Sequence, residues 1–173
     1  FEESYGYLAG THARDKDAVV ASMLICEMAA FYRTKGISLL QARENMYNKY
    51  GVYKHSQSSF VCEGVTGMQR MKELMTMLRE QTPKEIAGFK VTEFSDYIAS
   101  VTTDIATGAK TAITLPKSDV LGFVLENGAT VIIRPSGTEP KIKAYYTTTG
   151  KTQEEAAALE EKISDSFRKI LGF

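Results

Sequence analysis

Apolar residues recur at helical spacing in two segments near the N-terminus. The first helix is expected to start after a cap at Asp15 or Asp17 and to end before Gly36. The second is expected to run from a cap at Ser38 to Gly51, a common residue just past a helix end. The apolar stripes are Val20, Met23, Leu24, Met28 and Phe31 in the first helix, and Leu39, Ala42, Met46 and Tyr50 in the second.

Two further helical stripes lie in the remainder of the chain. One is rich in methionine, a flexible side chain that fills gaps in cores, so we expect all of its members to be buried. The other follows Thr152 and Glu155, which have the spacing of a capping box. The stripes are Met68, Met71, Met75 and Leu78, and Ala156, Leu159, Ile163, Phe167 and Ile170.

Strand patterns fill the region between these two helices. The pair Asn127-Gly128 separates the apolar runs 121–125 and 130–133 and predicts a hairpin. Residues 141–146 alternate polar and apolar side chains, which is typical of a strand with one buried face. Residues 89–99 are also strand-like, whereas residues 102–117 predict no definite element.

The polar stretch 55–59 interrupts these patterns, and we place a domain boundary there. Residues 1–58 are interpreted as the remnant of an α/β domain. Residues 59–173 are expected to form an α+β domain, with an antiparallel sheet of about four strands packed with two helices. Because the chain opens on Phe1 rather than a methionine, we interpret it as part of a longer protein.

Composition and charge narrow the classes of function. Hydrophobic residues make up 43% of the 173 positions and charged residues 24%, which is ordinary for a folded protein. Its 21 basic and 21 acidic residues cancel, which argues against binding to nucleic acid or to an anionic membrane. The distant Cys26 and Cys62 and only two histidines make a structural metal site improbable and favour a reduced cytoplasmic setting.

One loop has the chemistry of an anion site. Arg134 leaves a strand, and the segment Pro135-Ser136-Gly137-Thr138-Glu139-Pro140 comes next, with two hydroxyls around a glycine. A guanidinium, hydroxyls and inward-turned amides are the donors that bind phosphate oxygens. The same residues also suit a tight turn in which Arg134 pairs with a surface carboxylate, and chemistry alone leaves both interpretations open.

A family resemblance favours the phosphate site. The loop 134–140 resembles the phosphate-binding signature of the last domain of the α-D-phosphohexomutases, and Lys141-Ile142-Lys143 and a terminal helix come after it in that family's order. The segment Glu2-Glu3-Ser4-Tyr5-Gly6 resembles the sugar-recognition loop of the family's third domain, and residues 12–17 resemble the segment after that loop. The chain therefore resembles the end of the third domain plus the fourth, most like the bacterial phosphoglucomutase branch.

The resemblance implies roles for individual residues. It implies sugar binding by Glu2 and Ser4, substrate contacts near the reacting end by Lys16 and Arg14, and phosphate binding by Arg134, Ser136, Gly137 and Thr138. Lys141 directly follows the loop and is expected to add a smaller positive contribution.

The resemblance also implies an activity for the whole protein. That activity is the interconversion of glucose 1-phosphate and glucose 6-phosphate, through glucose 1,6-bisphosphate and with Mg²⁺. In this family the phosphoserine and the aspartate-rich magnesium loop lie in the first two domains, and neither motif occurs in this sequence. We therefore expect no catalytic residue, no metal ligand and no mutase activity in this chain, and its partners to be a phosphosugar and the missing N-terminal domains.

Several alternatives stay open at the level of the sequence. Tyr7 stands where hexomutases that also accept mannose tend to carry Gly-His, which favours the glucose branch. A phosphomannomutase or phosphopentomutase fragment is nevertheless compatible with the loops. So is a non-catalytic phosphosugar-binding regulatory module, whereas a nucleic-acid binder fits poorly with the neutral charge.

Overall fold

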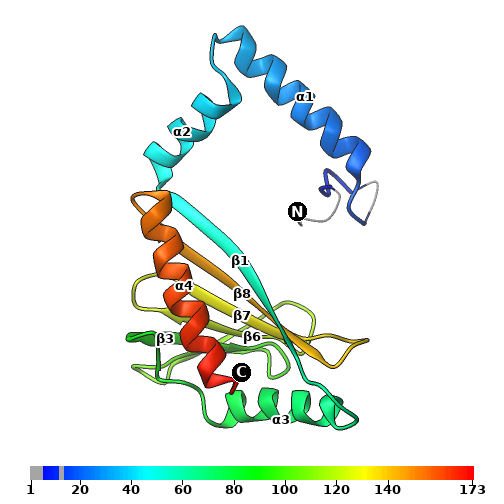
Figure 1. Cartoon of the computed structure of the whole chain (residues 1–173), viewed down its shortest axis with the longest axis vertical. Helices are drawn as coiled ribbons and strands as arrows, with labels where there is room; N and C mark the ends of the chain where they lie inside the picture. Colours follow the sequence, from blue (N-terminus) through cyan, green and yellow to red (C-terminus); the bar gives the residue numbers. More distant parts are fainter. Residues whose placement is uncertain (1–5, 12–13) are drawn as a thin grey trace. The chain divides into compact units, whose positions relative to one another are not determined.

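A computed structural model describes residues 6–11 and 14–173, which divide into two compact units between Tyr50 and Gly51. Figure 1 traces the chain through both units. The first unit contains α1 (Ala18–Thr34) and α2 (Leu39–Tyr50). The second contains β1 (Val52–Val61), α3 (Gly67–Glu80), β2 (Glu85–Ile86), β3 (Phe89–Asp96), β4 (Val101–Asp104), β5 (Lys110–Ala112), β6 (Leu121–Leu125), β7 (Thr130–Pro135), β8 (Lys141–Gly150) and α4 (Gln153–Ile170).

The two helices of the first unit begin at the expected caps. The Asp17 carboxylate accepts hydrogen bonds from the Val19 and Val20 amides at 2.8 and 3.0 Å. The Ser38 hydroxyl accepts one from the Gln41 amide at 3.1 Å. Between residues 6 and 11 and from residue 14 to 50, extended pairing is limited to an isolated bridge between Tyr7 and Asp17, so the described part of this unit is helical.

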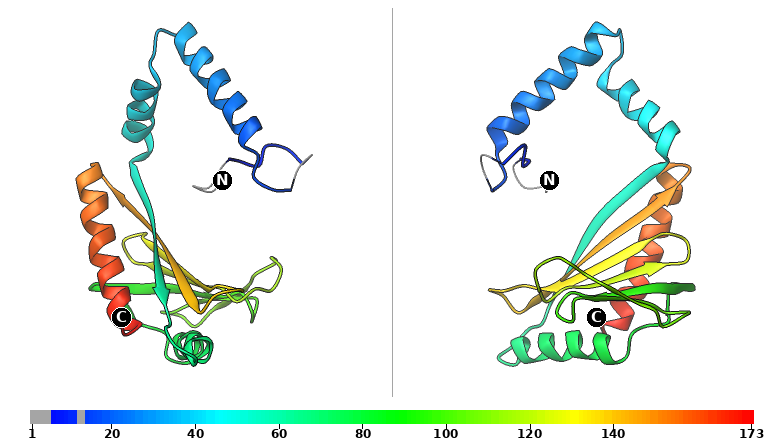
Figure 2. Two further views of the ribbon diagram at one scale, coloured as in Figure 1. Left: turned by 45° about the vertical axis from the view of Figure 1, so that its right-hand side comes forward. Right: turned by 180° about the vertical axis from the view of Figure 1, so that it is seen from behind.

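The second unit is an antiparallel sheet with α3 and α4 packed against it, which confirms the α+β class. The sheet has eight strands in the order β1-β8-β7-β6-β3-β4-β5, with β2 paired to β3. Figure 2 shows α4 running alongside β1 and β8, while α3 crosses below the sheet. The expectation of about four strands was therefore too low.

The additional strands have few buried side chains. In β1 only Val52 and Phe60 are buried, because this strand forms one edge of the sheet and leaves much of its surface to solvent. The polar stretch 55–59 thus lies within a strand, and the boundary placed after residue 58 falls inside β1. The strands β4 and β5 lie at the opposite edge and have no buried residue. Apolar periodicity is therefore weak at both edges.

The central strands match the sequence patterns. The strands β6 and β7 pair as the expected hairpin, and Gly128 adopts the left-handed φ of +80° that its turn requires. Ile142, Ala144 and Tyr146 are buried along β8 while their neighbours are partly exposed. The Thr152 hydroxyl caps α4 by accepting from the Glu155 amide at 3.2 Å. These elements were predicted correctly.

One core joins the sheet to both helices. Phe123 of β6 lies 5.8 Å from Phe167 of α4, centroid to centroid, and Met71 and Met75 of α3 are buried in the same cluster. Burying each such side chain contributes about 1.5–3 kcal/mol. Met68 is an exception, because 44% of it is exposed, so its predicted burial was wrong.

Gly67 fills a tight junction at the start of α3. A Cβ added there would lie 1.9 Å from the Cys62 carbonyl oxygen and 3.1 Å from Pro140 Cβ. The Cys62 amide in turn donates a 2.7 Å hydrogen bond to the Pro140 carbonyl. Cys62 follows β1 and Pro140 precedes β8, so three chain segments meet at this point.

We expect Gly67→Ala to destabilise the second unit by about 2 kcal/mol, because the obstructing atoms belong to the backbone. Urea unfolding followed by circular dichroism measures this change. Gly137→Ala is the matched control, since a Cβ there meets nothing within 4 Å. Equal midpoints for both variants would contradict the tight junction.

Candidate functional site

The loop between β7 and β8 is closed at its base by backbone hydrogen bonds. The Ser136 amide donates to the Lys141 carbonyl at 2.8 Å, and the Lys141 amide donates to the Glu139 carbonyl at 2.7 Å. The Cys62 bond to Pro140 holds the far side of the loop. These bonds fix the base, while Gly137, Thr138 and Glu139 are exposed at the tip.

Several donors of the loop have no protein partner. In the described part of the chain, the Gly137 amide and the Thr138 hydroxyl have no hydrogen-bond partner. The space beside Gly137 is open, and its φ is not in the left-handed region. The fold itself therefore does not require glycine at this position, whereas close approach of a bound group to the backbone would.

The Arg134 side chain is exposed and lies beside Tyr145 of β8. Its Nε and one terminal nitrogen lie 3.4 and 3.2 Å from the Tyr145 hydroxyl, and its guanidinium carbon lies 5.8 Å from the ring centroid. Arg134 forms no ion pair with any carboxylate of residues 6–11 or 14–173. The alternative of a surface ion pair is therefore absent from the described structure.

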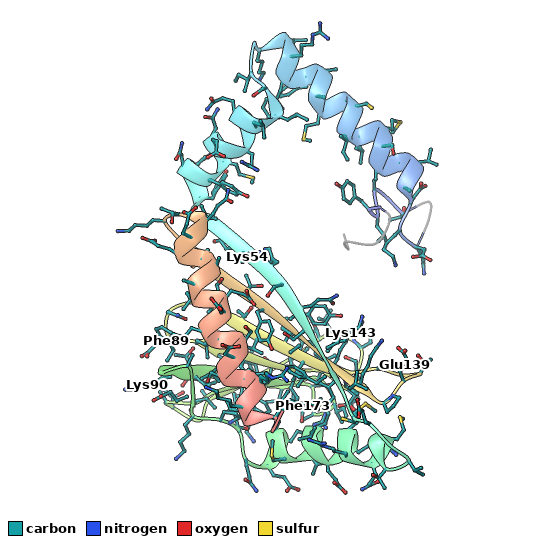
Figure 3. All side chains as sticks on the ribbon, viewed as in Figure 1. Lys54, Phe89, Lys90, Glu139, Lys143 and Phe173 are labelled. Atoms are coloured by element: carbon teal, nitrogen blue, oxygen red, sulfur yellow. The ribbon has the colours of Figure 1, made fainter. Side chains whose placement is uncertain are left out.

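Lys141 differs from Arg134 because its charge is compensated. Its ammonium forms an ion pair with the Glu139 carboxylate, which lowers the pKa of Glu139 below its ordinary value. Figure 3 shows Glu139 on the loop and Lys143 on β8. Both partners of the ion pair retain exposure to water, so the pair adds little to stability.

A groove of about 410 Å³ opens beside the loop. Its walls are the first half of α3, the segment 118–120 before β6, and residues 134–137. Buried Met71 and Met75 contribute apolar surface, and Lys72 and Ser118 contribute polar groups. The volume is within the range of small-molecule sites, which is about 300–1,000 Å³.

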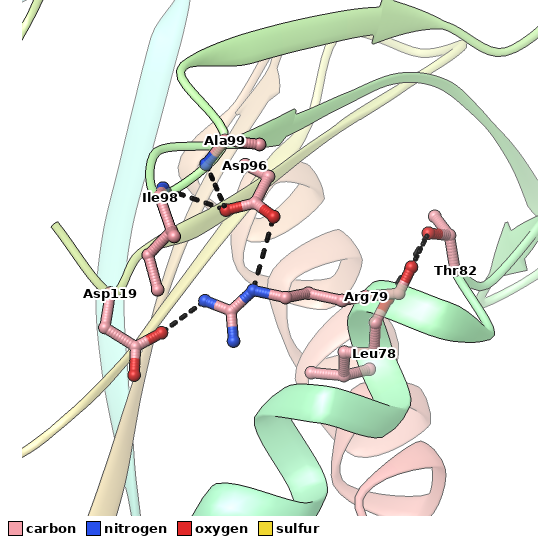
Figure 4. Close-up of polar contacts among 7 residues, drawn as sticks. All are labelled: Leu78, Arg79, Thr82, Asp96, Ile98, Ala99 and Asp119. Atoms are coloured by element: carbon pink, nitrogen blue, oxygen red, sulfur yellow. Dashed lines mark hydrogen bonds and ion pairs between the residues drawn. The ribbon is translucent and has the colours of Figure 1, made fainter. Parts of the chain in front are cut away.

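Arg79 holds one wall of this groove in place (Figure 4). Its Nε donates to the Asp96 carboxylate at 3.3 Å, and its terminal nitrogen pairs with Asp119. The Asp96 carboxylate also accepts from the amides of Ile98 and Ala99. One guanidinium thus connects α3 to the end of β3 and to the segment before β6.

The sugar-binding residues predicted from the sequence belong to the first unit. Glu2 and Ser4 lie outside the described residues. Arg14 is exposed, and Lys16 is partly buried, with its ammonium 3.2 Å from the Asp15 carboxylate. The predicted phosphate-binding residues all lie between positions 134 and 141 of the second unit, and they are Arg134, Ser136, Gly137, Thr138 and Lys141.

Within the described ranges, no three His, Cys, Asp or Glu side chains gather in a way that could hold a metal ion. No metal ligand is therefore assigned. Both cysteines are free thiols, Cys26 exposed and Cys62 buried. No helix in the described part of the chain has the length and apolar character to cross a membrane.

Family models match both units. Residues 69–166, more than half of the chain, match the phosphoglucomutase/phosphomannomutase C-terminal domain, and residues 1–50 match alpha/beta/alpha domain III of the same family. The chain belongs to the phosphoglucomutase/phosphomannomutase family. It is therefore a C-terminal portion of a phosphohexomutase, as the sequence motifs predicted.

Individual relatives agree with this assignment. The chain is 36% identical over 146 residues to a phosphoglucomutase of Staphylococcus saprophyticus, and 38% identical over 145 residues to one of Staphylococcus aureus. Each match covers 84% of this chain and 26% of the relative. The chain thus spans about a quarter of the length of these phosphoglucomutases.

A solved structure has a similar fold. It is the open form of the exocytosis-sensitive phosphoprotein pp63/parafusin, a phosphoglucomutase from Paramecium, with a TM-score of 0.58 and 21% identity. The match covers 93% of this chain and 28% of that protein. At this identity the likeness concerns the fold.

Sequence reasoning did not identify Tyr145 as the neighbour of Arg134, or Lys72 and the segment 118–120 as walls of the groove beside the loop. Arg134 pairs with Lys143 across β7 and β8, so Tyr145 is its diagonal neighbour on the same sheet face. The strand predictions alone did not include the register of β7 against β8, which is needed to place Tyr145 beside Arg134. Lys72 is next to a core methionine, and no local pattern indicates which loop the helix approaches.

We expect Arg79→Met to destabilise the second unit by about 1–2 kcal/mol, because it leaves the partly buried Asp96 carboxylate without its cation. Amide exchange should also accelerate at residues 118–120. Arg168→Met is the control, since that exposed side chain forms no ion pair in the described structure. If the two variants matched in unfolding midpoint and in exchange, Arg79 would not be holding the groove wall.

Proposed function

We propose that the loop 134–138 binds the phosphate group of a phosphosugar. The observation that carries the proposal is the combination of an exposed Arg134 without a carboxylate partner and a loop with unpartnered donors at Gly137 and Thr138. A guanidinium with neutral donors matches the needs of phosphate oxygens. The family supports the proposal, because its members act on phosphosugars by name.

The loop is proposed to hold the phosphate that does not react. Binding this distant group would position the sugar for transfer at its other end, so the contacts assist the reaction without touching the transferring atoms. Arg134, Ser136, Gly137 and Thr138 would donate to the phosphate. Glu2 and Ser4 would bind the sugar hydroxyls, and Arg14 and Lys16 would contact substrate near the reacting end.

For the whole protein we propose the interconversion of glucose 1-phosphate and glucose 6-phosphate. A phosphoserine outside this chain would give its phosphoryl group to the free hydroxyl, forming glucose 1,6-bisphosphate. It would then take back the phosphoryl group from the other oxygen. Mg²⁺ would be bound outside this chain, and a cytoplasmic setting is part of the proposal. The names of the relatives favour glucose, whereas the family description also includes phosphomannomutases.

We expect Arg134→Ala to weaken binding of glucose 6-phosphate at least about tenfold, because a charge-assisted hydrogen bond contributes about 1.5–3 kcal/mol. NMR titration of the 173-residue chain measures this, with the amides of residues 136–138 as reporters. The unfolding midpoint should hardly change, since the side chain is exposed. Arg168→Ala is the charge-matched control.

Tyr145→Phe should give a smaller loss, because it removes the hydroxyl beside Arg134 but keeps the ring. The loop would be misassigned if residues 136–138 stayed silent at millimolar ligand while other amides responded. Global unfolding of Arg134→Ala would instead point to a structural role for this arginine.

We also expect the chain alone to lack mutase activity, because the proposed phosphoryl donor lies in other domains. The assay supplies the pure chain with glucose 1-phosphate, Mg²⁺ and glucose 1,6-bisphosphate, and measures glucose 6-phosphate. The positive control is a full-length relative. Product formation that scales with the concentration of the chain and is lost in Arg134→Ala would overturn this expectation.

A further inference from the structure

The proposed phosphate loop borders α3 through the groove described above. Ser136 and Gly137, two of the proposed phosphate donors, line this groove together with Lys72. A phosphate bound to these two residues on the groove side would therefore face Lys72. The lysine stem spans four carbons, which lets its ammonium adjust to the position of an anion.

The charges around the groove leave two cations uncompensated. The Asp119 carboxylate lines the groove but is paired with Arg79, and Lys141 is paired with Glu139. Lys72 is exposed, and it forms no ion pair or side-chain hydrogen bond in the part of the chain that the structure describes. Arg134 likewise lacks a carboxylate partner there, and its guanidinium contacts the Tyr145 hydroxyl, so the residues that line the groove include two cations without an anionic partner.

We infer that Lys72 is the second cation of the phosphate site and that the groove selects a doubly charged phosphate ester over a singly charged one. This inference rests on the proposed function of the loop. Arg134 approaches from β7 and Lys72 from α3, so the two charges come from different walls of the groove. Two cations interact with the second negative charge of a phosphate far better than one does.

The surroundings of Lys72 strengthen this electrostatic effect. Met71 and Met75 are 4% and 1% exposed and form an apolar floor next to it. An anion in the groove would therefore be partly shielded from water. Its interactions with the two cations would be screened less than they are in bulk water. The volume of about 410 Å³ is sufficient for a monosaccharide phosphate.

The test compares two ligands of the same shape and different charge. Above the second phosphate pKa of about 6, glucose 6-phosphate is mostly a dianion, whereas glucose 6-sulfate remains a monoanion. Both are titrated by calorimetry at low salt into the 173-residue chain and its variants Lys72→Gln, Lys72→Arg and Arg134→Ala. Lys84→Gln is the matched control, an exposed lysine that does not line the groove.

We expect Lys72→Gln to weaken the binding of glucose 6-phosphate about tenfold, because one charge-assisted hydrogen bond is lost. The same substitution should weaken the binding of glucose 6-sulfate by about threefold or less, because this ligand lacks the second negative charge. Lys72→Arg should keep the preference for phosphate, and Lys84→Gln should bind like the original chain. Unfolding midpoints should not change, since Lys72 is exposed on a helix.

Three results would overturn the inference. If Lys72→Gln behaves like Lys84→Gln while Arg134→Ala weakens binding, Lys72 is not part of the site and the proposed function stands. If Lys72→Gln weakens the binding of both ligands equally, the groove does not distinguish a doubly charged ligand from a singly charged one. If Arg134→Ala and Lys72→Gln both bind normally, the loop is not the phosphate site, and the proposed function fails as well.

Discussion

The short backbone hydrogen bond from the Cys62 amide to the Pro140 carbonyl fixes the geometry on which the site depends. It joins the end of the edge strand β1 to the end of the β7–β8 loop. Gly67 permits this contact, because any side chain there would displace the Cys62 carbonyl. The same residue starts α3, so the position of the loop and the position of the groove wall are set by one junction.

The alternation of side chains along β7 and β8 places the core residues on one face of the sheet and Arg134 and Tyr145 on the other. Val131, Ile133, Ile142 and Ala144 face the core, and their neighbours Arg134 and Tyr145 face away from it. A shift of one residue in register would bury the guanidinium and expose the core side chains. The core therefore specifies the register, and the register places Arg134 on the exposed face of the sheet.

The fold was predictable where burial is periodic and less so elsewhere. The β6–β7 hairpin, β8 and α4 have clear patterns because one face of each is buried. In β1 most side chains are solvent-exposed, so its polar sequence resembles a linker, and the boundary predicted after residue 58 falls inside this strand. The candidate loop could be recognised in the sequence from its donor groups. The positions of Tyr145 and Lys72 beside it could not, because they result from strand register and helix packing.

The donors at the tip of the loop are exposed, and this exposure limits the energetic cost of leaving them without protein partners. A buried amide or guanidinium without a partner would cost several kcal/mol. At the tip of the loop, water can bind the Gly137 amide and the Thr138 hydroxyl, so their lack of protein partners imposes little folding penalty. The anchoring contacts at Cys62 and Gly67 are buried instead. The residues that anchor the loop, Cys62 and Gly67, are therefore not the residues that leave donors free, Gly137 and Thr138, and the loop keeps its position without using those donors.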